Sequence, residues 1–136
     1  MPEIYRVSGP VVSVEGLKAR MYDVVRVGED KLIGEVIQIR PDKVVVQVYE
    51  DTSGLKPGEP VENTGQPLTV ELGPGLLKNI YDGIQRPLPD LKVLMGDFIQ
   101  RGAQAYSLDR KKKWHFVPQV KKGQEISPGS IIGTVK

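Results

Sequence analysis

Short apolar runs separated by turn residues fill the N-terminal half of the chain. The clearest is Leu32–Ile39, where Leu32, Gly34, Val36 and Gln38 share one face of an alternating pattern. Similar runs predict strands at 4–7, 11–14, 22–27, 43–50 and 68–72, with turns at 15–16, 40–42 and 63–65. Several short strands at this spacing favour a small closed barrel, because closure leaves no open strand edges. We therefore expect an all-β fold that begins with a β-barrel over 1–73.

The hydrophobic period changes in the segment Gly73–Pro89. Leu76, Leu77, Ile80, Tyr81 and Ile84 recur at helical spacing, which predicts a short amphipathic helix. Two prolines, at 87 and 89, are expected to stop it. This segment is interpreted as a helical connector over 74–90, whose apolar face covers the open end of the barrel.

The remaining segment, 91–136, has a different character. Turns are expected at 121–123 and 127–129, with extended chain at 117–120 and a final strand at 131–135. Glycine-marked turns between short apolar runs favour a compact barrel-sandwich-like arrangement. We expect this bulge segment to form the third part of the chain.

The composition limits the residues that can form the core and the chemistry that the chain can perform. The chain has 136 residues, a net charge of +2, no cysteine, 39% hydrophobic residues and 6% aromatic residues. The core must therefore rest on Val, Ile and Leu, and disulfides and thiolate chemistry are excluded. Near-neutral charge gives no general indication of nucleic-acid binding.

Several longer motifs in the chain resemble those of a known protein family. They are Val7–Val12, Met21–Val25, Leu32–Ile37, Val48–Leu55, Pro67–Gly75 and, above all, the run GPGLLKNIYDGIQRPL at 73–88. Together they resemble the N-terminal region of the catalytic A subunit of archaeal and vacuolar-type rotary ATPases. Further pieces, Gly96–Ile99, Arg101-Gly102, Lys113-Trp114, Phe116 with Pro118, and Ile131–Val135, are similar to the bulge insertion of those subunits.

The resemblance implies a role in assembling the alternating A and B subunits of a hexameric head, with the bulge directed towards the peripheral stalk. It implies a cytoplasmic location, peripheral to the membrane through the complex. ATP and magnesium belong to the full-length subunit. This chain has no Gly-Lys dipeptide, and so it lacks the phosphate-binding loop G-x-x-x-x-G-K-[ST]. We expect no cofactor and no ATP hydrolysis by this chain, which resembles the barrel and bulge of a longer subunit.

No catalytic or metal-binding constellation is evident. His115 is the single histidine, and Ser8, Ser13 and Ser53 have no base at motif spacing. The GIQRPL segment leads from the barrel towards the bulge in the family that the chain resembles. We therefore expect Arg86, with Asp82 and Tyr81, to fix that junction.

Two other interpretations stay open. Arg110–Phe116 places a basic run beside aromatic residues, which can bind single-stranded nucleic acid, although a solvated hairpin tip is the commoner role. The glycine-marked turns of the bulge also resemble a biotinyl or lipoyl carrier domain. No lysine here has the acidic or methionine-flanked context of such a carrier, so we expect no attached group.

Overall fold

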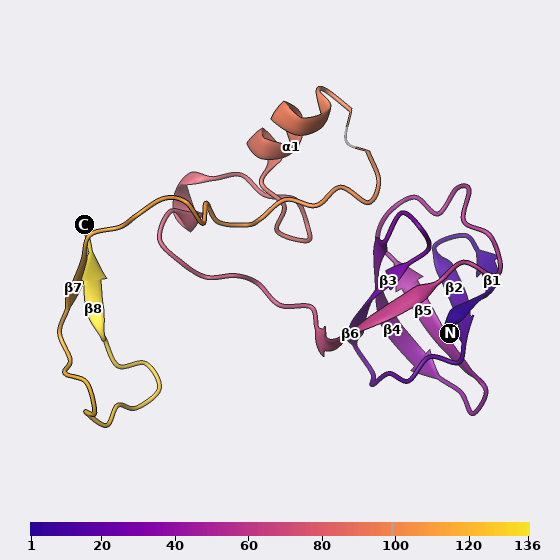
Figure 1. Ribbon diagram of the computed structural model, residues 1–136, viewed down its shortest axis with the longest axis horizontal. Coiled ribbons are helices and arrows are strands. Elements are labelled where there is room, and N and C mark those ends of the chain that lie inside the picture. The colour runs from indigo at the N-terminus through magenta and orange to yellow at the C-terminus, as the bar shows by residue number, and fades with distance from the viewer. Residues whose placement is uncertain (99) are drawn as a thin grey trace.

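The computed structural model describes residues 1–98 and 100–136. Six strands form one antiparallel sheet in the order β1-β2-β5-β4-β3-β6. Their bounds are β1 Glu3–Ser8, β2 Val11–Glu15, β3 Asp23–Val27, β4 Leu32–Ile39, β5 Lys43–Val48 and β6 Val61–Pro67. Figure 1 shows them as one unit, which also holds the N-terminus.

The sheet closes on itself where β1 meets the start of β6. Glu3 bridges Pro60, the Ile4 N–H donates to the Glu59 carbonyl at 2.9 Å, and the Val61 N–H donates to the Pro2 carbonyl at 3.0 Å. Closure satisfies backbone groups that an open edge would leave exposed. The all-β fold with an N-terminal barrel is thereby confirmed.

The barrel interior is almost entirely aliphatic. Nine of its eleven buried core residues are valine, which packs well on a pleated surface. They are Ile4, Val12, Val14, Val25, Val27, Leu32, Val36, Val44, Val46, Val48 and Val61. Of the face that Leu32, Gly34, Val36 and Gln38 were expected to share, the first three residues are buried in the barrel. An irregular register between Val36 and Gln38 interrupts the alternation beyond them.

Two strand-level predictions at the end of the barrel are wrong. The expected strand at 68–72 is irregular chain, and the expected turn at 63–65 lies inside β6. The register explains the error. Asp23 pairs with Pro67 while Val25 pairs with Asn63, so β6 carries extra residues there, with Gly65 at φ 71°. The glycine marks a bulge in the closing strand, and no strand edge remains for 68–72 to join.

The predicted helix is also misplaced. Within 76–84 only Leu76–Lys78 forms a 3₁₀ turn, and the α-helix α1 spans Leu88–Met95. Pro87 is the extended residue before α1 and Pro89 lies in its first turn, where proline costs no hydrogen bond. The two prolines therefore start a helix and do not end one.

Beyond the barrel the chain has little core of its own. Leu91 is the only hydrophobic residue described as buried outside the barrel. The strands β7 Phe116–Pro118 and β8 Gly133–Val135 form a two-stranded antiparallel ribbon, which Figure 1 shows far from the barrel, beside the C-terminus. Ile99, part of the bulge piece 96–99, lies outside the described residues.

Candidate assembly site at the barrel junction

The carboxylate of Glu50, two residues after the end of β5, is the centre of the junction. Its side chain is only 8% exposed. One oxygen accepts a hydrogen bond from the Gly102 N–H at 2.7 Å and lies 3.4 Å from Nη1 of Arg86. The other accepts from the Ile33 N–H of β4 at 3.5 Å. One barrel carboxylate thus contacts the connector and the segment that follows α1.

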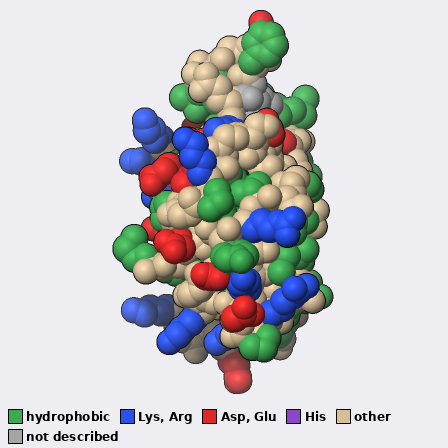
Figure 2. Space-filling model, turned by 90° about the vertical axis from the view of Figure 1, so that its right-hand side faces the viewer, with side chains coloured by type: hydrophobic (Ala, Val, Ile, Leu, Met, Phe, Trp, Pro, Cys, Tyr) green, Lys and Arg blue, Asp and Glu red, His purple; other side chains and the backbone are tan. Residues whose placement is uncertain are grey.

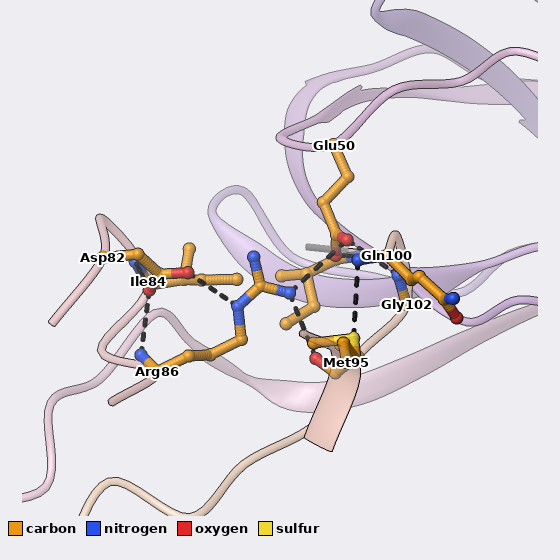
Figure 3. Close-up of polar contacts among 9 residues, drawn as sticks. Glu50, Asp82, Ile84, Arg86, Met95, Gln100 and Gly102 are labelled. Carbon is orange, nitrogen blue, oxygen red and sulfur yellow. Dashed lines mark hydrogen bonds and ion pairs between the residues drawn. The ribbon is translucent and has the colours of Figure 1, made fainter. Parts of the chain in front are cut away.

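Arg86 joins these parts from the connector side (Figure 3). Its Nε donates to Oδ2 of Asp82 at 2.7 Å, and its Nη1 donates to the carbonyl of Ala103 at 3.0 Å. The Arg86 side chain is 12% exposed and its guanidinium lies between two carboxylates, so its charge is compensated where water cannot solvate it fully. Its planar fork suits several simultaneous acceptors better than lysine would.

A tight turn holds Asp82 in place. Its Oδ1 accepts from the N–H groups of Ile84 at 3.1 Å and Arg86 at 2.8 Å. Burial opposes ionisation, but the Arg86 amide and guanidinium and the Ile84 amide hold the pKa of Asp82 below its usual value. Gln85 adopts φ 63°, and its side-chain amide bonds both the N–H and the carbonyl of Glu71. The turn is therefore fixed from both sides.

The segment at 101–103 also contacts the β3–β4 turn of the barrel. Arg101 pairs with Asp30 at 2.8 Å and lies against Gly54. Gly102 has φ 71°, and a Cβ there would collide with the carbonyl oxygen of Asp30. A side chain at this position would therefore push the segment off the barrel.

Tyr81 serves a separate contact. Its hydroxyl donates to the carbonyl of Ser107 at 2.9 Å. The same stretch of connector packs Gly75 against Trp114 and Gly73 against Leu108. The structure thus brings Arg86 and Asp82 together, while Tyr81 ties the connector to residues further along the bulge.

The sequence alone did not point to Glu50, Arg101 or Gly102 as junction residues. The Arg101-Gly102 pair lay in a bulge motif, but its partners Glu50 and Asp30 are distant in sequence. A charged residue at a strand end beside a turn is too common to stand out. The sequence signal for the junction was limited to the unusual GIQRPL run.

The basic run at 110–113 is engaged within the chain. Arg110 pairs with Glu71, and its guanidinium carbon lies 5.9 Å from the Tyr106 ring centre. Lys112 Nζ lies 4.2 Å from the ring centre of Trp114. These contacts support an intramolecular role for the run.

Elsewhere the described residues offer little chemistry. Among residues 1–98 and 100–136, no group of three or more His, Cys, Asp or Glu is placed to hold a metal ion. No helix in these ranges is long and apolar enough to cross a membrane. The junction itself is a network of ion pairs and hydrogen bonds.

Residues 4–65 match the β-barrel domain of the ATP synthase alpha/beta family, and residues 105–136 match the barrel-sandwich domain of its alpha/beta subunits. The chain belongs to the ATP synthase alpha/beta family.

Its relatives within the family include A-type ATP synthase subunits A. The subunit from Thermoplasma acidophilum is 60% identical over 100% of this chain and 18% of its own length. The subunits from Methanosarcina barkeri and Methanopyrus kandleri are 60% and 56% identical over 98% of this chain and 23% of theirs. This chain thus spans about a fifth of the length of these relatives, and it is similar to their N-terminal region.

A solved structure supports the fold. The assembled ATPase EscN, in complex with its central stalk EscO from the type III secretion system of enteropathogenic E. coli, aligns with a TM-score of 0.60. The identity is 27%, and the alignment covers 65% of this chain and 22% of EscN.

Proposed function

We propose that this chain acts as the N-terminal barrel and bulge of a catalytic A subunit in an archaeal-type ATP synthase, where it assembles the hexameric head of a proton- or sodium-translocating rotary enzyme. The observation that carries the proposal is 56–60% identity to A-type subunits A over nearly the whole chain. ATP, magnesium and turnover belong to the full-length subunit, because the phosphate-binding loop is absent here.

In this proposal the three parts of the chain have different tasks. The barrel at 1–73 meets neighbouring B subunits, the connector at 74–90 fixes orientation, and the bulge at 91–136 faces outward towards the peripheral stalk. The complex lies on the cytoplasmic side, peripheral to the membrane. A closed barrel suits a ring position because it has no free strand edge that would pair with the wrong chain.

The junction supports an orienting role for the connector. Arg86 and Asp82 lie with Glu50 in one buried network, and Tyr81 reaches Ser107. A network of charge-assisted hydrogen bonds fixes the relative orientation of two segments better than apolar contact alone, because such bonds depend on geometry. Its role is to set the angle at which the bulge leaves the barrel.

Binding to a purified archaeal B subunit tests the proposal. We expect this chain to bind B more tightly than it binds itself, to compete with a full-length A subunit for B, and to hydrolyse no ATP. Analytical ultracentrifugation and a coupled ATPase assay provide these readouts. The variant Val46→Asp, which buries a charge in the barrel core, is the unfolded control. ATP turnover by the pure chain, or equal binding of B to wild type and to Val46→Asp, would refute the proposal.

A further inference from the structure

A pocket opens where the outer wall of the barrel faces the connector. Its volume is about 410 Å³, and Arg26 of β3, Ile33 of β4, Ile84 and Arg86 of the connector, and the segment 103–106 line it. It is separate from the Glu50 contact, although Arg86 borders both. Arg26 points outward because its neighbours Val25 and Val27 fill the barrel core.

Arg26 is half-buried, and it is absent from the ion pairs that the described part of the chain forms. Its cross-strand neighbour on β6 is Glu62. The carboxylate of Glu62 lies 3.9 Å from Nζ of Lys31. Among the described residues Arg26 therefore has no ion-pair partner, and an external anion in the pocket could accept charge-assisted hydrogen bonds from its guanidinium.

The charges around the pocket select the kind of anion. Arg86 is already compensated by Glu50 and Asp82, so Arg26 alone offers an uncompensated positive charge. A phosphate dianion carries one negative charge more than Arg26 can compensate, because the Arg86 charge is already taken up by Glu50 and Asp82. A single carboxylate matches both the charge and the planar fork of the guanidinium.

The other walls are suited to a protein segment. Ile33 and Ile84 are apolar, and the Tyr106 side chain, which is 77% exposed, borders the opening. One charge-assisted pair contributes too little to hold a free acid at low concentration, but it adds usefully to a larger interface. Figure 2 shows one face of the molecule, on which cationic, anionic and apolar side chains are interspersed without one large charged area.

We propose that this pocket is a receptor for a Glu or Asp side chain, presented beside an apolar residue on a loop of the neighbouring subunit in the ring. That the neighbour is a subunit of the ring rests on the proposed function. The carboxylate preference of the pocket does not depend on it.

A direct titration of the full chain tests the carboxylate preference. N-acetylglutamate is added to ¹⁵N-labelled protein, and N-acetylglutamine, which lacks the charge, is the matched probe. We expect the Arg26 Nε–H resonance to shift in a saturable manner with the glutamate probe alone, and the shift to disappear in Arg26→Gln. Equal responses to both probes, or no response, would overturn the inference.

Binding to B subunits tests whether the neighbouring subunit supplies the carboxylate. We expect Arg26→Gln to weaken B binding about tenfold and to flatten its salt dependence, while Arg26→Lys, which keeps the charge and loses the fork, falls between. The control is Arg6→Gln on β1, which is exposed and outside the pocket. Thermal unfolding checks that Arg26→Gln stays folded, as expected for a residue with no ion pair to lose.

The two proposals fail in different ways. Failure of wild type to bind B refutes the proposed function, and the titration then decides the pocket by itself. If wild type binds B and Arg26→Gln binds equally well, the assembly proposal stands and the pocket is not the receptor.

Discussion

Replacing Arg86 by alanine removes the guanidinium that Glu50 and Asp82 share. Two carboxylates then remain in a largely enclosed site, with side chains 8% and 19% exposed. The barrel core contains none of these residues, so the loss falls on the attachment of the 101–103 segment and leaves the barrel intact. We expect the junction to open locally while the barrel stays folded.

The magnitude follows from the geometry. Removing one partner of a buried ion pair costs about 3–5 kcal/mol. The Asp82 contact is short at 2.7 Å, but the Glu50 contact is long at 3.4 Å, and the site is not fully enclosed. We therefore expect a free-energy cost at the lower end of this range, about 3 kcal/mol. This corresponds to about a hundredfold increase in the equilibrium constant for opening of the junction.

Amide hydrogen exchange measures this opening at a single atom. The Gly102 N–H donates to Glu50 and should exchange about a hundredfold faster in Arg86→Ala, while barrel amides such as Val46 keep their rates. Lys31→Ala is the control, because its pair with Glu62 is long and exposed, and its loss should change little. An unchanged Gly102 rate, or equal acceleration at Val46, would refute the reasoning.

Three further results are expected. Leu32→Ala should lower the free energy of unfolding in urea by about 2–5 kcal/mol because Leu32 is fully buried, whereas Leu77→Ala, at a side chain 99% exposed, should change it by less than about 0.5 kcal/mol. A hydrogen bond with Glu35 at 2.6 Å raises the pKa of Tyr49 to about 12, so Glu35→Gln should lower the ultraviolet titration midpoint of Tyr49 towards 10.0, and an unchanged midpoint contradicts this contact. The lowered pKa of Asp82 stabilises the junction above the usual value of 3.8 and loses that contribution as the pH falls through the depressed value; Gly102 exchange, corrected for intrinsic rates, should show this loss in wild type and not in Asp82→Asn.

Prediction from the sequence succeeded where a pattern has one structural solution. The alternation at Leu32–Ile39 gave β4 with its bounds, because a period of two with one buried face fits only a strand. It failed where several solutions compete. Leu68, Val70 and Leu72 alternate in the same manner, yet they are exposed because β6 already closes the sheet.

The connector shows a second limit. The apolar spacing at 76–84 predicted a helix, but the chain instead turns back at Asp82–Arg86 through hydrogen bonds to a side chain and a positive φ at Gln85. Side-chain capture of backbone groups competes with helix formation and leaves no hydrophobic signature. The motif drew attention to Arg86, whereas its contact with Glu50, 36 residues away in the sequence, is visible only in three dimensions.

The separation between Glu50 and Gly102 has a consequence for biosynthesis. A ribosome releases residues in order, and β6 ends at Pro67, so the barrel can close before the segment at 101–103 has left the ribosome. In that interval water would occupy the place of the Gly102 N–H and the Arg86 guanidinium at Glu50, and the later segment would dock onto a closed barrel. On this order of events an error at the junction would arise late, and it would leave a closed barrel whose connector and bulge point in the wrong direction.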